Sequence, residues 1–442
     1  MNWAEEELSG ISLGDARLDK RAQRLLSSLS NRPESSIPQA CGGLSEVKAA
    51  YRLIEREELD WRELLQPHWN KAAQRMGTEE VVLCIQDTTE LNFNGRQAQG
   101  LGRLSYEAQR GMYAHPTYAV TPGRVPLGLI DCWMWSRKGK DEEDIIESRR
   151  WIEGYERVAE VGQGLPRTRL VYVADREGDI GALLERAQEL NYPADLLIRI
   201  KHDRKIPLQG KRLFEALSQA PTLGEIEFDL AAGRGRRARP VTQSVSVVRG
   251  EISVSNKQSV ELTAVQATET ATPAGEKPVC WRLLTNRPIQ TLAQAVELID
   301  WYRARWEIEM FFHIVKTGCR VEQLQLDRME RIERVLALYL IVAWRINYLM
   351  RLGRECPEMS CQAVFEKDEW QGAYLLARKT PPPEPPTLNE IMRVVALSGG
   401  FLGRKGDGHP GAKALWRGMQ ALYFFVEGMR AARNIGNTQT YG

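Results

Sequence analysis

A short segment near residue 300 carries polar side chains whose types suit work on a phosphate group or a metal ion. Tyr302, Arg305, Glu309 and Lys316 follow one another at spacings of three, four and seven. In a helix of about 3.6 residues per turn, these spacings place all four within an arc of roughly 60°. A solvated helix face with an ordinary pair between Arg305 and Glu309 would have the same spacing. The opposite side of this helix is predicted to be buried through Ala304, Ile308, Phe311 and Val315.

Two aspartates occur upstream, each at or just beyond the end of a segment with the composition of a buried strand. Asp87 follows VVLCIQ, and Asp175 follows VYVA. Ligands of open α/β sheets bind at the carboxyl ends of the strands, although a single Asp after a strand is more often a turn former or a helix cap. Together with Glu309, the two aspartates could bind a pair of divalent ions, and these ions would contact both sides of a phosphodiester.

The chemistry of these residue types is that of metal-dependent phosphoryl transfer. One ion would help to deprotonate an attacking water or 3′ hydroxyl, and the other would stabilise the leaving oxygen. Carboxylate ligands favour a hard ion such as Mg²⁺ or Mn²⁺. Arg305 and Lys316 would bind neighbouring phosphates, Arg305 through two parallel N–H donors and Lys316 through its single ammonium group. Tyr302 would donate a hydrogen bond to another phosphate oxygen.

Length and composition are those of an ordinary soluble protein with room for two to four structural units. The 442 residues are 43% hydrophobic and 27% charged, and the net charge of +2 neither indicates nor excludes a nucleic-acid partner. The acidic start lacks an apolar signal core, and the longest apolar run, 335–344, is too short to span a bilayer. We therefore expect a cytoplasmic protein without a membrane partner. Seven cysteines without a CxxC pair and five scattered histidines indicate neither a disulfide framework nor a zinc site.

The order of expected elements is helical, then α/β, then helical. Residues 1–70 are predicted to form helices, with a basic stripe that could follow a phosphate backbone or simply be solvated. Apolar strands are expected at 81–85, 170–174 and 196–200, helices at 142–159 and 179–190, and an antiparallel β unit at about 201–280. Helices resume at Thr291, and a Pro-rich connector at 379–387 precedes a helical tail with excess apolar surface. The basic stripe consists of Arg17, Lys20, Arg21 and Arg24.

Three motifs in this order resemble those of bacterial cut-and-paste DDE transposases of the insertion sequence four family, in the subgroup with a Tyr-Arg-Glu-Lys signature. They are QDTTELNF around Asp87, VADREGDI around Asp175 and YRARWEIEMFFHIVKTG from Tyr302. Further segments of the same kind, from LGDARLDKR to GGFLGRKGDG, extend the resemblance over nearly the whole chain.

The resemblance implies an α/β fold with an RNase H-like mixed-sheet core. A helical transposon-end DNA-binding region would cover residues 1–70, the catalytic domain 71–375 with its β insertion at about 201–284, and a helical dimerisation region 376–442. Asp87, Asp175 and Glu309 would be the catalytic residues and the ligands of two Mg²⁺ per active site, with Mn²⁺ as a substitute. Such an enzyme nicks its terminal inverted repeats, forms and opens a hairpin, and transfers the 3′ ends into target DNA. It would act as a homodimer, each subunit cutting the end held mainly by its partner.

Further DNA contacts are implied by the resemblance or by charge. Trp281 and Trp306 match aromatic positions at the hairpin, one of them as a pocket for a flipped base, although a core tryptophan is the commoner case. The hairpin role is predicted for Trp281 and left open for Trp306. His313 stands where relatives carry a lysine, so one phosphate contact would be weaker or pH-dependent here. A basic patch just after the strand at 196–200, and the basic segment 233–239, would neutralise phosphates of the duplex. The patch consists of Arg199, Lys201, Arg204 and Lys205.

Other functions remain open at this stage. An RNase H-like nuclease without strand transfer would share the three acids but would not join DNA ends. A non-catalytic DNA-binding transposase relative would retain the fold, although the presence of all three acids argues against it. A glycosidase with a carboxylate pair would leave Arg305, Lys316 and the basic stripe without a role.

Overall fold

The structure is a computed structural model that describes residues 3–96, 98–106, 108–137, 147–230, 237–255 and 258–438. Its centre is an 11-stranded mixed sheet. The strands are β1 (Val81–Gln86), β2 (Thr89–Asn92), β3 (Gly102–Arg103), β4 (Arg110–Val120), β5 (Pro126–Trp135), β6 (Arg169–Ala174), β7 (Asp195–Arg199), β10 (Thr222–Leu230), β11 (Arg239–Ser253), β12 (Ser259–Glu269) and β13 (Cys280–Thr285). They follow the order β10-β11-β12-β13-β7-β6-β1-β4-β2, with β3 and β5 also paired to β4. The mixed α/β prediction is therefore confirmed.

The middle of the sheet combines parallel and antiparallel pairs. β1 is parallel to β6 and β6 to β7, whereas β4 is antiparallel to both β1 and β5. β1 and β6 are buried along nearly their whole length, which explains their continuous apolar sequences. Gln86 at the end of β1 is in register with Ala174 at the end of β6. The residues that follow, Asp87 and Asp175, therefore leave the sheet at the same level.

Two hydrophobic cores cover the two faces of this sheet, as the alternation of a strand requires. Leu83 and Ile85 of β1 belong to the larger core, and Val82 and Cys84 to the smaller one. The smaller core is closed by α6 (Arg149–Gln163) and α7 (Gly181–Glu189), and the larger core by the long helix α11 (Met329–Glu355). α5 (Trp61–Met76) contributes to both cores.

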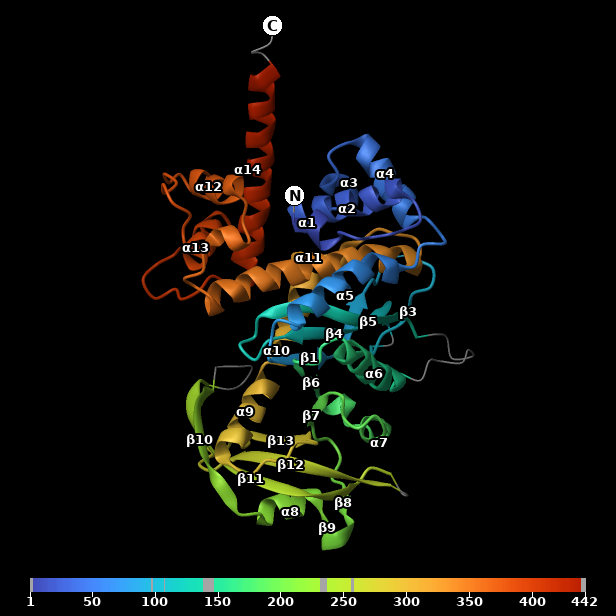
Figure 1. Cartoon of the computed structure of the whole chain (residues 1–442), viewed down its shortest axis with the longest axis vertical. Helices are drawn as coiled ribbons and strands as arrows, with labels where there is room; N and C mark the ends of the chain where they lie inside the picture. The colour runs from blue at the N-terminus through green and yellow to red at the C-terminus, as the bar shows by residue number, and fades with distance from the viewer. Residues whose placement is uncertain are drawn as a thin grey trace.

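The helix α11 passes a length and composition test for a membrane span. Its apolar stretch is longer than the run at 335–344 that the sequence analysis considered. However, 83% of its most apolar window is buried inside the protein. Such burial is that of a core helix, and in Figure 1 α11 lies between the sheet and the terminal helices.

The N-terminal and C-terminal helices lie on the same side of α11 (Figure 1). The C-terminal group packs around α14, which extends away from the sheet (Figure 1). The N-terminal helices are α1 (Trp3–Glu7), α2 (Ala16–Asn31), α3 (Ile37–Ala40) and α4 (Leu44–Ile54). The C-terminal helices are α12 (Lys367–Leu376), α13 (Leu388–Ser398) and α14 (Ala412–Thr438).

The predicted β insertion continues the central sheet. β13 pairs with β7 through Leu283 opposite Arg199 and Leu284 opposite Ile198, so β10 to β13 extend one edge as an antiparallel block. The helix α8 (Leu213–Gln219) and the small hairpin of β8 (Lys205–Ile206) and β9 (Lys211–Arg212) lie beside this block (Figure 1).

A buried polar cluster attaches the first helix to the sheet. Glu7 of α1 bonds to Nδ1 of His68 at 2.6 Å and to Nη2 of Arg75 at 2.9 Å. His68 Nε2 accepts the backbone N–H of Leu129 at 3.0 Å, so the buried ring is neutral. Burial alone would raise the pKa of Glu7, but the hydrogen bond of His68 and the hydrogen bonds and charge of Arg75 outweigh it and lower that pKa to about 2. The ionised Glu7 therefore stabilises the folded protein.

We expect Glu7→Gln to lower the free energy of unfolding by about 3 kcal/mol at neutral pH, the value of a pKa depression of this size. Because the folded-state pKa is below the unfolded value of 4.5, the contribution is complete above that pH and is lost as the pH falls toward about 2. Urea unfolding at several pH values measures the difference. Glu5→Gln, at an exposed position of α1, is the control. An equal loss in both variants, or a difference that persists at acid pH, would contradict the prediction.

Candidate active site

The segment that carries the polar stripe is divided into several helical pieces, so the prediction of one continuous helix was wrong. α9 (Leu292–Arg303) ends before Arg305, and α10 (Trp306–His313) begins after it. A π-helical turn, η3 (Ile314–Gly318), follows directly. A π turn is wider than an α turn, and it moves Lys316 out of the alignment expected from a 3.6-residue period.

The buried side of the segment is as predicted. Ala304, Ile308, Phe311 and Val315 are each at most 1% exposed and belong to the larger core. This packing fixes the rotation of α10 and directs Arg305 and Glu309 toward the ends of β1 and β6. Thr291 caps α9 by accepting the N–H of Gln294, and so defines where the segment begins.

Asp87 lies in an interruption between β1 and β2, both of which pair with β4 in one continuous register. That register places Asp87 opposite Pro116, which has no N–H to donate to the ladder. The backbone can therefore leave the sheet here, and Asp87 Oδ1 accepts the N–H of Thr88 at 2.8 Å. Asp175 Oδ1 similarly accepts the N–H of Glu177 at 2.8 Å, and caps the 3₁₀ turn η1 (Arg176–Gly178). Asp175 is thus a helix cap, as the alternative interpretation proposed. The cap uses only one of its two carboxylate oxygens.

Arg305 joins Asp87 to Glu309. Its Nη1 lies 2.6 Å from Asp87 Oδ2, and its Nη2 lies 2.7 Å from Glu309 Oε1. The ordinary helix pair considered in the sequence analysis is therefore present, but the same guanidinium also holds the end of β1. Arg305 is 8% exposed and the Asp87 side chain is 19% exposed, so this end of the link is largely buried, whereas the Glu309 side chain is 41% exposed.

The acids influence one another electrostatically. Burial raises the pKa of Asp87 to about 6, the charge of Arg305 opposes this rise, and the negative charges of Asp175 and Glu309 add to it. Asp175 and Glu309 are thus near enough to Asp87 to disfavour its charged form. An added cation would relieve this repulsion.

The three acids agree with the predicted metal in the kind of ligand but not in their grouping. The three acids offer only oxygen ligands, which suit a hard divalent ion. Within the part of the chain that the structure describes, no three His, Cys, Asp or Glu side chains are grouped closely enough to hold a metal ion as they stand. Arg305 occupies the position between Asp87 and Glu309. The oxygen donors therefore suit Mg²⁺ in kind, while in this arrangement the Arg305 guanidinium lies between two of them.

Tyr302 and Lys316 occupy different surroundings. The hydroxyl of Tyr302 is buried and has no hydrogen-bond partner among the described residues, and burial raises its pKa. Burial also lowers the pKa of Lys316, against the charges of Glu322 and Glu90. Lys316 is thus close to the β2 side of the site, whereas Tyr302 is close to Arg305.

The aromatic candidates differ in exposure. Trp306 is 61% exposed, and the Arg305 guanidinium lies 5.4 Å from the centre of its ring. Trp281 is half-buried on β13 and stacks on Phe228 with ring centres 5.4 Å apart. His313 is exposed at the end of α10, and its ring centre lies 5.9 Å from that of Trp416. Exposure therefore makes Trp306 the more accessible of the two tryptophans.

The predicted basic patch is divided by burial. Lys201 and Lys205 are exposed, and Arg199 is half-buried at the end of β7, where its charge acts on Tyr302. Arg204 is 8% exposed and pairs with the buried Asp179 at 2.5 Å, so it is held inside the protein and is not part of an exposed patch. Most of the basic segment 233–239 lies outside the described residues.

The N-terminal basic stripe lies on α2. Its four residues line a groove of about 230 Å³ between α2 and α4, together with residues such as Ser45 and Glu46. Three of the four are exposed and one is half-buried. The stripe therefore faces a groove at the surface. Its members are Arg17, Lys20, Arg21 and Arg24.

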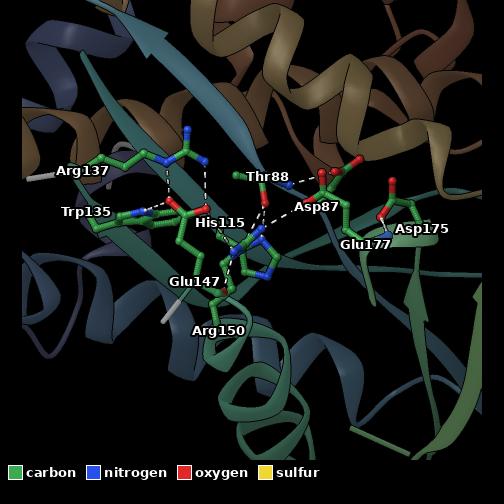
Figure 2. A network of polar contacts seen from close by, with 9 residues as sticks. All are labelled: Asp87, Thr88, His115, Trp135, Arg137, Glu147, Arg150, Asp175 and Glu177. Atoms are coloured by element: carbon green, nitrogen blue, oxygen red, sulfur yellow. Dashed lines mark hydrogen bonds and ion pairs between the residues drawn. The ribbon is translucent and has the colours of Figure 1, made fainter. Parts of the chain in front are cut away.

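A polar network that the sequence patterns did not predict lies behind the two aspartates (Figure 2). Thr88 and Glu177 stand within the two aspartate motifs, and this proximity in sequence was the available signal. His115 and Arg150 come from β4 and α6, and no local pattern distinguishes them.

Three family models match successive parts of this chain. They are described as transposase DNA-binding at residues 1–59, transposase DDE domain at 165–345 and transposase Tn5 dimerisation domain at 341–439. These matches identify the class of protein, a transposase. The chain carries the DNA-binding, DDE and dimerisation domains of a DDE transposase, which confirms the predicted class. The predicted domain boundaries and catalytic residues stay predictions. The DDE match includes Asp175 and Glu309 and begins after Asp87.

One solved structure is also similar, a cryo-EM structure of the piggyBac transposase synaptic complex with hairpin DNA. The likeness covers 80% of this chain and 72% of that chain, at 10% sequence identity and a TM-score of 0.38. DDE transposases in general use divalent ions such as Mg²⁺.

Proposed function

We propose that this protein is a DNA transposase of the insertion sequence four family that cleaves its transposon ends through a hairpin and transfers the 3′ ends into target DNA. The observation that carries the proposal is the placement of Asp87 and Asp175 at one level on neighbouring parallel strands, with Glu309 tied to Asp87 through Arg305. The order β5-β4-β1-β6-β7, in which only β4 runs antiparallel to the other four strands, supports an RNase H-like core.

Asp87, Asp175 and Glu309 would hold two Mg²⁺, with Mn²⁺ as a substitute. When bound, the ions would activate the attacking oxygen and stabilise the leaving oxygen. For Glu309 to join the aspartates, Arg305 must leave its two carboxylates, and a DNA phosphate is a suitable new partner for a guanidinium fork. Tyr302, whose hydroxyl lacks a partner, would donate to a phosphate oxygen, and Lys316 would bind a phosphate on the β2 side.

The proposal extends to partners and place of action. Terminal inverted repeats would bind along the stripe on α2, where exposed cations face a groove. The dimerisation domain favours a homodimer that brings two transposon ends together, each subunit cutting the end held mainly by its partner. We propose that the enzyme acts in the cytoplasm of a bacterium, on chromosomal and target DNA.

Incubation of the purified protein with DNA from both flanks of its coding region tests this function. With Mg²⁺, we expect nicks at short inverted repeats, then hairpin ends, and finally joining of 3′ ends to an added plasmid, all resolved on denaturing gels. Calcium in place of Mg²⁺ should permit binding without cleavage. Nicking without joining would identify a nuclease, and binding without any cleavage a non-catalytic relative.

Trp306 is expected to act at the hairpin step. Because its ring is exposed beside Arg305, it is available to stack on an extruded base, a contact of about 1 to 3 kcal/mol. Trp306→Ala should slow hairpin formation about tenfold or more and leave the first nick unchanged, and Trp306→Phe should restore much of the rate. Single-turnover assays separate the two steps, and Trp281→Ala is measured in parallel. An equal loss at both steps in Trp306→Ala would exclude this role.

A further inference from the structure

One buried arginine lies behind the two aspartates and contacts the residues that follow each of them. Arg150 is near the start of α6 and is 6% exposed. Its Nε donates to Thr88 Oγ1 at 3.3 Å, and its Nη2 donates to Glu177 Oε2 at 3.1 Å. Its Nη1 donates to the carbonyl of Glu147. Each nitrogen of the guanidinium thus has a separate acceptor.

Thr88 connects Arg150 to Asp87. The backbone N–H of Thr88 donates to Asp87 Oδ1 at 2.8 Å, while its hydroxyl meets both Arg150 and Nδ1 of His115, the latter at 2.9 Å. The His115 side chain is buried on β4, against the ring of Trp151 at 4.5 Å between centres. Thr88 therefore has little freedom to move, and it fixes one oxygen of Asp87.

Glu177 connects Arg150 to Asp175 in the same way. The backbone N–H of Glu177 donates to Asp175 Oδ1 at 2.8 Å, and the side chain of Glu177 reaches back to Arg150. The chain of contacts Asp87, Thr88, Arg150, Glu177, Asp175 thus joins the ends of β1 and β6 outside the sheet ladder (Figure 2).

We propose that Arg150 is a positioning residue that sets the spacing and orientation of Asp87 and Asp175 for a divalent cation. This inference rests on the proposed function, because it assigns the two aspartates to a metal. The ladder between β1 and β6 ends at Gln86 and Ala174, so pairing between these two strands no longer sets the distance between the residues that follow. A planar guanidinium with several donors can hold both ends at once, which a lysine ammonium cannot do with the same geometry. Partners of this outer kind typically change metal affinity about 10- to 100-fold when they are removed.

The test measures Mn²⁺ binding by electron paramagnetic resonance in the full-length protein bound to its end DNA, beside cleavage and melting temperature. Arg150→Met should weaken Mn²⁺ binding about 10- to 100-fold and leave end-DNA affinity unchanged. Arg150→Lys should give little rescue. Glu177→Gln should weaken Mn²⁺ binding in the same direction but less, and because Glu177 is 61% exposed, this variant does not endanger the fold.

A double-mutant comparison separates positioning from general damage. If Glu177 acts through Arg150, Glu177→Gln should cost nothing further in the Arg150→Met background. Arg186→Met is the matched control, because Arg186 on α7 also contacts two carboxylates, Glu156 at 2.7 Å and Glu189 at 3.0 Å, but on the solvent side. It should bind Mn²⁺ like the wild type.

The outcomes distinguish this inference from the proposed function. A wild-type complex that neither binds Mn²⁺ nor cleaves DNA would refute the proposed function itself. A wild-type complex that does both, beside Arg150→Met with unchanged Mn²⁺ affinity, would overturn the positioning role alone. Fully additive effects of Arg150→Met and Glu177→Gln would overturn it as well.

Discussion

Asp175→Asn is expected to reduce DNA cleavage about a thousandfold or more, the consequence of losing several kcal/mol of metal-based transition-state stabilisation. Asparagine keeps the side-chain oxygen that accepts the N–H of Glu177, so the cap of η1 at 2.8 Å is retained. The substitution removes only the negative charge and one metal-binding oxygen. Binding of end DNA should therefore remain close to that of the wild type.

This design separates the two roles that Asp175 combines in the structure. Asp175→Ala loses both the cap and the ligand, so a difference in melting temperature between the Ala and Asn variants reports the cap alone. Asp60→Asn is the matched control. Asp60 caps α5 by accepting the N–H of Arg62 at 2.8 Å, and it is not adjacent in sequence to the ends of β1 and β6. Cleavage by Asp175→Asn within about tenfold of the wild type would show that Asp175 is only a cap.

The features that the sequence predicted well depend on local patterns. Apolar runs of five or six residues identified β1 and β6 because strands buried on both faces contain no polar alternation. The same runs located Asp87 and Asp175 at their ends. Burial of Ile308 and Phe311 followed from helical periodicity, because that pattern survives even where the helix is interrupted.

The features that the sequence did not predict depend on partners distant along the chain. Arg204 belongs to a basic segment that resembles a surface patch in sequence. Only the fold shows that its side chain is buried in an ion pair with Asp179. Arg150 meets Thr88 across 62 positions, which no local spacing reveals. The break at Arg305 and the π turn at Lys316 are matters of backbone hydrogen-bond register, to which hydrophobic periodicity is insensitive.

Arg305→Met is expected to reduce cleavage about a hundredfold and, at the same time, to change how the protein responds to metal. In the structure, Arg305 neutralises Asp87 and Glu309 at 2.6 and 2.7 Å. Without that charge, the buried Asp87 faces Asp175 and Glu309 with no cation, so its pKa should rise further above about 6. The melting temperature without metal should fall, because an uncompensated buried charge is costly.

Metal should then restore the stability that the arginine had supplied. Mn²⁺ would replace the lost positive charge, so we expect it to raise the melting temperature of DNA-free Arg305→Met more than that of the wild type, in which Arg305 competes for the same carboxylates. Arg303→Met is the control, because Arg303 pairs with the exposed Asp300 at 3.3 Å instead. An equal Mn²⁺ response in wild type and Arg305→Met would mean that Arg305 does not occupy the metal position. A larger response together with lost cleavage would indicate that the guanidinium first holds the acids apart from metal and then moves to the phosphate.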